Sequence, residues 1–590
     1  MESRARRVEA ARGDRPLDLL IEHTQLVNVY TREVYLADIG IAGGYVAHVG
    51  SPGEWKSALP QPKARFPAEG KYAVPGLVDT HVHIESSMMS PAGFAAAVLP
   101  HGTTTVVVDP HEIANVMGLR GVRYMLDATA NLPLRVYVQV PSCVPAVPSL
   151  ETAGAAFGPE QVAEMLAWDR VIGLAEVMDY VGVVQQGDRM RAILDVALAH
   201  ETAISGHCPG LHGPELAAYM MGGPLSDHEG IDPDELLEKL RFGMTVEGRI
   251  SSFGESMSVL GELVRQLGTV PPNLVLCTDD VFPEDLLHAG HMDNVVRGAI
   301  SGGFPAIDAV RAATLHGAQR HRLHDLGAIA PGKRADILLL RDLESFEPDE
   351  VFVDGRMVAQ GGHLQVSLPR MQSAVEQENT VHLPRPPRRE DFELHARQGR
   401  QRENLRVMTI GPDYLRGLEV TDFPVHEGIV DISASDDICL ASITERHGQT
   451  GGRSLTLVKG PNLRQGAVAS TVAHDSHNLL VLGRDAQDMT TAARELVACG
   501  GGICCVRERQ VMALLPLPIA GLMSPKPLEE LVPLVHQISQ ALRDLGMDFR
   551  QPIGPVLGLA LPVIPSYGIT DKGLVDVDNQ VVLSIWPDEV

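Results

Sequence analysis

The sequence has few cysteines, a shortage of basic residues and no long apolar run, and each shortage excludes a class of protein. Only 7 cysteines occur in 590 residues, an odd number without regular spacing, so we expect free thiols in a reducing compartment. Lysine and arginine number 49 against 75 acidic residues. The resulting formal charge of −26 argues against nucleic acid and anionic membranes as partners and predicts a solvated acidic surface.

The scarcity of apolar runs also argues against membrane insertion and secretion. Residues 513–523 (ALLPLPIAGLM) contain prolines and are shorter than the ~20 residues that span a bilayer. The N-terminal stretch MESRARRVEAARGDR is charged and has no apolar segment typical of a signal peptide. With 590 residues, of which 44% are hydrophobic, we expect a cytoplasmic protein of two to four domains.

Two short β-rich regions bracket the middle of the chain. Residues 18–50 alternate apolar and polar side chains with a period of two, which is typical of strands. A similar pattern returns at 335–360, where Asp354-Gly355 predicts a type I′ hairpin turn. We therefore predict one small β-sandwich domain built from both flanks, residues 1–74 and 323–368.

The middle section, residues 75–322, alternates short apolar runs with helical segments such as 159–168, 189–200 and 255–267. About eight such βα units predict an α/β fold with a (β/α)8 TIM-like barrel of the metallo-hydrolase kind. Polar residues cluster where the apolar runs end. Active sites of such barrels lie at the C-terminal ends of the strands, so we expect the site there.

The last third of the chain is predicted to form a separate unit. Residues 369–405 are rich in Pro, Arg, Glu and Gln, which predicts a linker or an extended surface segment. Residues 406–590 contain strand-like runs, such as RSLTLVK and NLLVLG, and a helical segment near 489–500. We therefore expect an additional C-terminal α/β domain.

Residues 78–87 read VDTHVHIESS and end the first predicted barrel strand with two histidines. Because residues i and i+2 of a strand share a face, His81 and His83 can both reach one metal ion. Later strand ends add further imidazoles and carboxylates: Glu176, His207, His228 and Asp279. Any one of these could be a satisfied loop residue, but six at five strand ends predict a metal centre suited to Zn, Fe or Mn.

Several motifs resemble the amidohydrolase superfamily of metal-dependent hydrolases, and within it the bacterial adenine deaminase family. They include PGLVDTHVHIESSMMSP, VDPHEIANVMG, GLAEVMD, SGHCPG, LCTDD and GAVASTVAHDSHNLLVLG. The resemblance extends over nearly the whole chain past residue 18, and IESSMMSP, DPHEIANV and VAHDSHN are its most specific parts.

The resemblance implies two divalent metals per chain, usually described as manganese or iron, with zinc also possible. The imidazoles divide into two pairs, His81 and His83 for the more buried metal, and His207 and His228 for the second. Glu176 would bridge the metals, where many superfamily members have a carboxylated lysine. Asp279 would bind the first metal and also act as the catalytic proton carrier.

The implied reaction is hydrolysis of adenine to hypoxanthine and ammonia by a metal-bound hydroxide in purine salvage. A metal lowers the pKa of bound water from ~15.7 toward ~7, which supplies hydroxide at neutral pH. Asp279 would take the proton from the nucleophile and pass it toward the departing nitrogen. The family further implies a homodimer or a higher homo-oligomer.

Four more polar residues follow the first two barrel strands at the same mouth: Glu85, Asp109, His111 and Glu112. A purine needs donors and acceptors at its ring nitrogens, so a second catalytic carboxylate such as Glu85 could serve N1. The others are assigned to substrate binding or an extra metal, with loop capping as the alternative. Met88 and Met89 are predicted to pack rather than to contact a purine.

The C-terminal motif AHDSHN forms another polar cluster, with His474, Asp475, His477 and Asn478. It predicts either a hydrogen-bonded structural turn or groups that the C-terminal domain contributes to the pocket or to another ion. Cys208, next to His207, is expected to be a buried small side chain.

Two other functions compete with the deaminase. A cyclic amide or imide hydrolase of the dihydropyrimidinase type would normally use a carboxylated lysine, where this chain has Glu176. A catalytically inactive structural relative would not need all six ligands. The segments TVEGRISS (245–252) and PVIPSYGIT (562–570) depart from the family pattern and affect the substrate prediction. The His-x-Glu match to cytidine-type deaminases is accidental, because no C-x-x-C follows.

Overall fold

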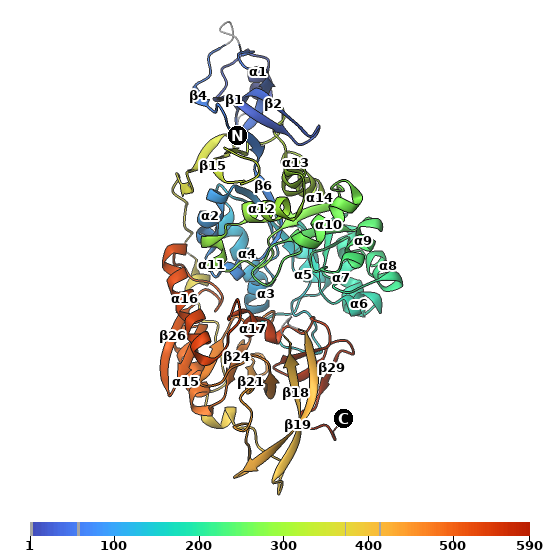
Figure 1. Ribbon diagram of the computed structural model, residues 1–590, viewed down its shortest axis with the longest axis vertical. Helices are drawn as coiled ribbons and strands as arrows, with labels where there is room; N and C mark the ends of the chain where they lie inside the picture. Colours follow the sequence, from blue (N-terminus) through green and yellow to red (C-terminus); the bar gives the residue numbers. More distant parts are fainter. Residues whose placement is uncertain (1–3, 56–59, 372, 412–414, 590) are drawn as a thin grey trace.

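The computed structural model describes residues 4–55, 60–371, 373–411 and 415–589. The other positions, which fall in the predicted β-domain, linker and C-terminal domain, lie outside the described residues. Three parts follow one another along the long axis of the molecule: a small β-rich domain, a helix-covered barrel and a C-terminal domain (Figure 1). A short helix, α1 (Arg4–Ala11), lies against the β-rich domain.

Strands from both sides of the barrel form the small β-domain. The nine strands described there belong to one connected sheet, in which β5 and β14 pair antiparallel and so join the two flanks. The strands are β1 (Leu19–Asn28), β2 (Glu33–Ala42), β3 (Tyr45–Gly50), β4 (Ala64–Pro67), β5 (Tyr72–Pro75), β14 (Ile337–Leu340), β15 (Pro348–Val353), β16 (Arg356–Gln360) and β17 (His363–Leu364).

The hairpin between β15 and β16 has the predicted turn. Asp354 and Gly355 both have positive φ, 49° and 71°, as a type I′ turn requires. Val353 pairs with Arg356 across this two-residue connection. Ile21, Ile39 and Phe352 belong to one buried apolar cluster, so strands from both flanks share a core.

The barrel contains the eight parallel strands that the sequence pattern predicts. Strands β6 to β10 form one sheet and β11 to β13 another. A bridge between Val82 and Asp279 brings β6 beside the end of β13. The strands are β6 (Leu77–Val82), β7 (Thr103–Val108), β8 (Arg135–Val140), β9 (Val171–Val177), β10 (Ala203–Gly206), β11 (Ser226–Asp227), β12 (Thr245–Arg249) and β13 (Leu274–Cys277).

Helices between the strands cover the outside of the barrel (Figure 1). Three of them, α5, α7 and α10, lie where helical periodicity predicts them. The helices are α2 (Pro91–Val98), α3 (His111–Met117), α4 (Leu119–Thr129), α5 (Pro159–Leu166), α6 (Tyr180–Val184), α7 (Asp188–Ala199), α8 (Gly213–Met221), α9 (Pro233–Arg241), α10 (Met257–Leu267), α11 (Pro283–His288), α12 (Met292–Gly302), α13 (Ala306–Arg311) and α14 (Gly317–Arg320).

The described residues of the segment between the β-domain and the C-terminal domain include two short 3-10 turns, Ala374–Gln377 and Arg389–Phe392. It contacts both larger units. The hydroxyl of Tyr124 on α4 donates to Glu376 at 3.0 Å, and the amide of His382 donates to the Arg446 carbonyl at 2.7 Å. The segment therefore runs along the barrel before it reaches the C-terminal domain.

Among its described residues, the C-terminal domain contains a nine-stranded sheet and a separate three-stranded sheet. Strands β22 and β24 and helix α15 lie in the regions expected from the sequence. The strands are β18 (Arg402–Ile410), β19 (Arg416–His426), β20 (Ile429–Val430), β21 (Ile438–Thr444), β22 (Arg453–Lys459), β23 (Ala467–Ser470), β24 (Leu479–Gly483), β25 (Gly502–Arg507), β26 (Gln510–Pro516), β27 (Tyr567–Thr570), β28 (Gly573–Asp576) and β29 (Val581–Leu583). The helices are α15 (Ala486–Cys499), α16 (Leu528–Leu545) and α17 (Gly554–Leu557).

The C-terminal domain contacts the barrel just after strand β6. The Ser524 amide donates to the Met88 carbonyl at 2.8 Å, and the Ser90 amide donates to the Ser524 carbonyl at 3.0 Å. Met88 and Met89 are both 0% exposed and belong to the main apolar core, as predicted. Within the described chain, no helix combines the length and apolar character needed to cross a bilayer.

Candidate metal centre and active site

Strand β6 delivers two buried histidines to the mouth of the barrel. The ring centroids of His81 and His83 lie 4.7 Å apart, with an interplanar angle of 86°. His83 Nδ1 lies 3.0 Å from the Asp109 carbonyl oxygen, to which it donates, and this contact orients Nε2 toward the interior. His81 Nε2 is buried and has no hydrogen-bond partner among the described residues. Both rings therefore offer a nitrogen to the same space.

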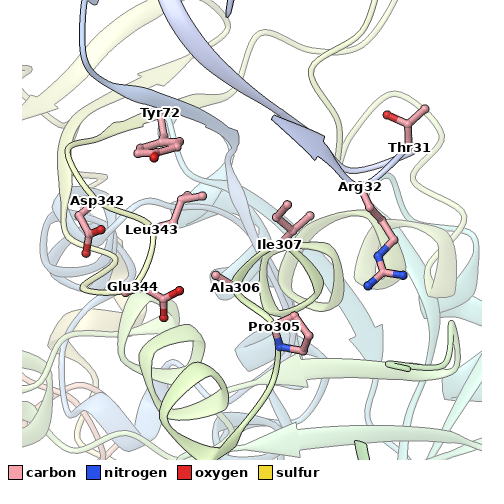
Figure 2. A pocket seen from close by; sticks show the side chains of 9 residues that line it. All are labelled: Thr31, Arg32, Tyr72, Pro305, Ala306, Ile307, Asp342, Leu343 and Glu344. Carbon is pink, nitrogen blue, oxygen red and sulfur yellow. The ribbon is translucent and has the colours of Figure 1, made fainter. Parts of the chain in front are cut away.

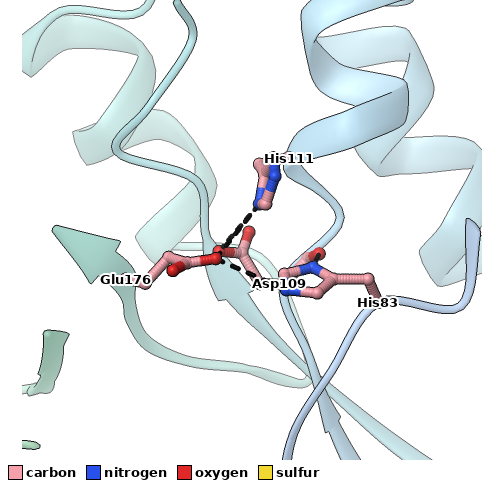
Figure 3. A group of neighbouring side chains, drawn as sticks. All are labelled: His83, Asp109, His111 and Glu176. Atoms are coloured by element: carbon pink, nitrogen blue, oxygen red, sulfur yellow. Dashed lines mark hydrogen bonds and ion pairs between the residues drawn. The ribbon is translucent and has the colours of Figure 1, made fainter. Parts of the chain in front are cut away.

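Glu176, at the end of β9, has a different set of imidazoles at each carboxylate oxygen. Oε1 lies 3.4 Å from His83 Nε2 and 3.5 Å from His111 Nδ1 (Figure 3). Oε2 lies 2.9 Å from His207 Nδ1 and 3.4 Å from His228 Nε2. Burial raises the pKa of Glu176, but hydrogen bonds from His207 and His228 outweigh it and hold the pKa well below its usual range. The carboxylate is therefore ionised and faces two groups of ligands.

Asp279 follows β13 and approaches the same histidines. Its amide donates to the His81 carbonyl at 3.0 Å, and Oδ1 lies 3.3 Å from His83 Nε2. Oδ2 accepts a hydrogen bond from Arg249 Nη1, and the same guanidinium group bonds Glu229 at 2.5 Å. Burial raises the pKa of Asp279, but the positive charge of Arg249 outweighs it and holds the pKa well below the usual range.

His207 and His228 come from the ends of β10 and β11. Their ring centroids are 5.3 Å apart, and the His228 ring stacks on His81 at 4.2 Å. Tyr219 holds the end of β10: its hydroxyl accepts from the His207 amide at 3.0 Å and donates to the Val177 carbonyl at 2.6 Å.

The six predicted metal ligands are brought together. Ligand atoms of His81, His228 and Asp279 lie within 4.8 Å of one another, as do those of Glu176, His207 and His228. All six side chains are buried, between 1% and 7% exposed. Imidazole and carboxylate donors at such spacing suit a Zn, Fe or Mn centre, and the unpartnered His81 Nε2 is the kind of atom that a cation would satisfy.

Asp109 and His111, predicted to contact substrate or an extra metal, lie against Glu176 and His83. One ligand atom from each of these four residues lies within 4.8 Å of the others. His111 Nδ1 is 3.2 Å from Asp109 Oδ2. Neither carboxylate oxygen of Asp109 has a hydrogen-bond partner in the described structure. These two residues therefore belong to the edge of the same cluster.

Glu85 and Glu112 are also buried. Glu85 Oε1 accepts from the Ile113 amide at 3.2 Å, while Oε2 has no partner among the described side chains. Burial, together with the charge of Glu112, raises the pKa of Glu85 to about 8. Glu112 Oε1 accepts from Ser86 at 2.7 Å, and Glu112 Oε2 faces the C-terminal domain.

The AHDSHN loop of the C-terminal domain reaches the barrel mouth. Asp475 Oδ1 lies 3.4 Å from His111 Nε2, and His477 Nε2 lies 3.6 Å from Glu112 Oε2. Asn478 Nδ2 donates to the Thr152 carbonyl at 2.8 Å, so this side chain makes a structural contact. The loop is thus both hydrogen-bonded and in contact with the candidate site.

Arg249 is a site residue that the sequence pattern did not identify. It is the last residue of strand β12, at the C-terminal strand ends where the site is expected, but a basic side chain is not a metal ligand, so a search for ligands does not select it. It lies in the segment TVEGRISS, residues 245–252. Glu247 of the same strand accepts from Thr80 at 2.7 Å and therefore supports the base of the site.

A cavity of about 700 Å³ lies elsewhere, between the β-domain and helix α13 (Figure 2). Its lining combines Thr31, Tyr72 and Leu343 with a few charged groups. One of these, Arg32, is already paired with Asp308 at 2.6 Å. The cavity contains none of the candidate ligands, so we place the chemistry at the buried cluster and not there.

The chain is similar to known proteins over nearly its whole length. Residues 72–358 match the amidohydrolase family, and residues 415–581 match the adenine deaminase C-terminal domain. The chain is 42% identical over 587 residues to an adenine deaminase of Oleidesulfovibrio alaskensis, with 98% of each chain covered. It is 42% identical over 574 residues to an adenine deaminase of Moorella thermoacetica, with 96% of each covered. Adenine deaminase 2 of Carboxydothermus hydrogenoformans is 40% identical over 582 residues, with 98% of each covered.

Proposed function

The chain belongs to the adenine deaminase family of amidohydrolases, and from this membership we propose that it hydrolyses adenine to hypoxanthine and ammonia. The observation that carries the proposal is the convergence of four imidazoles and two carboxylates from five strand ends on one buried space. Such a donor set, inside a barrel of this family, suits a hydrolase that depends on a divalent metal.

We propose that the centre holds two divalent cations, manganese or iron with zinc as a further possibility. His81, His83 and Asp279 would hold one cation, and His207 and His228 the other. Glu176 would bridge the two, because each of its oxygens faces a different group of imidazoles. When bound, such a cation acidifies a coordinated water and so supplies the nucleophile at neutral pH.

Asp279 is proposed as the proton carrier. Arg249 keeps its pKa low, so the side chain is a carboxylate at neutral pH, the form that accepts a proton. Replacing the C6 amino group by an oxygen requires the nucleophile to lose protons and the amino nitrogen to gain one before it leaves as ammonia. A carboxylate between the two can take the first proton and deliver it to the second.

Glu85 is proposed as a second catalytic carboxylate. With its pKa raised to about 8, it is protonated at neutral pH and can donate to a ring nitrogen such as N1. Asp109 and His111 are proposed to contact the substrate, since both lie at the edge of the ligand cluster. A cytoplasmic place in purine salvage and a homodimer or higher homo-oligomer remain predictions from family membership.

The test is release of ammonia and hypoxanthine from adenine by the purified, manganese-supplied enzyme. We expect turnover with adenine and none with a cyclic imide such as hydantoin. Activity on the imide alone would favour the cyclic amide hydrolase, and metal content without either activity would contradict the proposal. Asp279→Asn provides the control for contaminating deaminases.

A further inference from the structure

A second group of buried polar side chains lies where the barrel meets the C-terminal domain. Glu112 comes from helix α3 of the barrel, whereas His474 and His477 come from the loop after strand β23. One ligand atom from each lies within 4.8 Å of the others, and all three side chains are buried. Two imidazoles and one carboxylate are a donor set that suits Zn, Fe or Mn.

Each side chain of this group has a buried polar atom without a hydrogen-bond partner. Glu112 Oε2, His474 Nε2 and His477 Nε2 make no hydrogen bond within the described part of the chain. His477 Nε2 and Glu112 Oε2 are 3.6 Å apart, which is too long for a hydrogen bond. Buried polar atoms are normally paired, so three orphaned atoms in one buried group indicate a ligand there.

The surroundings of the group are rich in negative charge. The Ser86 hydroxyl lies 2.7 Å from Glu112 Oε1 and also bonds Asp280, but its one proton can serve only one carboxylate at a time. A buried concentration of carboxylates favours a bound cation.

The alternative to a bound cation is a set of hydrogen bonds in which a proton lies between the imidazole and the carboxylate. The Ala473 amide lies 3.3 Å from His477 Nδ1, which favours a proton on Nε2 that points to Glu112. That arrangement still leaves His474 Nε2 and Glu85 Oε2 without partners. For a cation to bind His477 Nε2, the proton of the neutral ring moves from Nε2 to Nδ1, and the 3.3 Å contact with the Ala473 amide is lost.

We propose that Glu112, His474 and His477 bind a divalent cation additional to those of the Glu176 centre. Because its ligands come from two domains, this cation would tie the C-terminal domain to the wall of the active site. The proposal concerns metal content and does not depend on the reaction that the enzyme catalyses.

Metal analysis of the protein purified with Mn²⁺ tests the proposal. We expect Glu112→Gln and His474→Ala each to contain one Mn²⁺ per chain fewer than the wild-type enzyme. His536→Ala removes a largely exposed histidine of the same domain and should leave the Mn²⁺ content unchanged. Wild-type Mn²⁺ content in both site variants would overturn the proposal.

Because a variant can also lose metal by misfolding, anomalous diffraction from wild-type crystals with Mn²⁺ provides an independent measurement. We expect a peak between Glu112, His474 and His477, separate from the peaks around Glu176. Peaks around Glu176 alone would overturn the proposal. Absence of ammonia release from adenine would contradict the proposed function but would leave the interdomain peak in place, so the two failures are distinguishable.

Discussion

His111 Nε2 lies 3.4 Å from Asp475 Oδ1, so a barrel residue beside the candidate metal centre is paired with a carboxylate of the C-terminal domain. The other ring nitrogen of His111 lies 3.5 Å from Glu176. The imidazole therefore connects the ligand cluster to a loop that is more than 300 residues away in the chain (475 − 111 = 364). Through this contact, a charged group of the C-terminal domain lies next to a residue of the candidate site.

Replacing Asp475 by Asn should lower kcat on adenine by about tenfold or more, because partners that orient residues at a metal centre typically contribute 10–100-fold. The amide keeps the size of the side chain but removes the charge facing His111. Steady-state kinetics give kcat and KM separately. Asp548→Asn, at an exposed position of the same domain, is the matched control and should behave as wild type. An unchanged kcat in Asp475→Asn would show that the contact is structural only.

Replacing Asp279 by Asn should preserve the fold and much of the metal while turnover falls by about 10²–10⁴-fold, the usual contribution of a positioned proton carrier. The amide can still lie beside Arg249 but cannot accept a proton. Circular dichroism and elemental analysis check fold and metal, and ammonia release checks turnover. Near-normal turnover would remove Asp279 from proton transfer.

Replacing Glu176 by Gln should remove at least one metal per chain, because a neutral amide cannot bridge two cations as a carboxylate does. Elemental analysis after gel filtration gives the stoichiometry. Glu284→Gln, a carboxylate of helix α11 outside the cluster, serves as the control. Equal metal content in Glu176→Gln and wild type would show that Glu176 does not bridge.

Chelation should both inactivate the enzyme and lower its thermal stability, because a ligand that binds only the native state stabilises it by mass action. Added Mn²⁺ should restore activity and Tm together. Calorimetry and the ammonia assay follow the two quantities on the same samples. A Tm that does not respond to chelator would argue against structural coupling between the metals and the fold.

We expect the buried carboxyl group of Glu151 to lower the free energy of unfolding as the pH rises. Burial raises its native-state pKa from 4.5 to about 8, so the native state retains a proton that the unfolded state releases above pH 4.5. Glu151→Gln should therefore match the wild type near pH 5 and exceed its unfolding free energy by roughly 2–4 kcal/mol at pH 8. Urea denaturation of both proteins at the two pH values measures this difference. A constant difference across pH would show that Glu151 is ionised in the native state.

Much of the fold and most of the cluster follow from local sequence patterns. Apolar runs that end in polar residues locate the barrel strands. Because parallel strands bring their carboxyl ends to one mouth of the barrel, polar residues at those ends, such as His81, Glu176 and Asp279, are expected to lie together. The two-residue strand β11 is barely visible in the pattern, and His228 marks it better than any apolar run does.

The remaining features depend on contacts between distant segments. Arg249 acquires its importance only when β12 places it beside Asp279 and Glu229. The pairing of His111 with Asp475 requires the C-terminal domain to dock on the barrel, and no local periodicity encodes that docking. The 369–405 segment looks like a free linker in composition, yet its contacts with α4 and Arg446 hold it in place.

The antiparallel pairing of β5 with β14 also has a mechanical consequence. Strand β5 lies just before the barrel segment and β14 just after it. The hydrogen bonds between these strands therefore hold the two ends of the barrel segment together without a covalent link. A protease that cuts a surface loop of the barrel would leave two fragments, each still anchored in the same sheet. Nicked enzyme should therefore elute as an intact particle and separate into pieces only in denaturant.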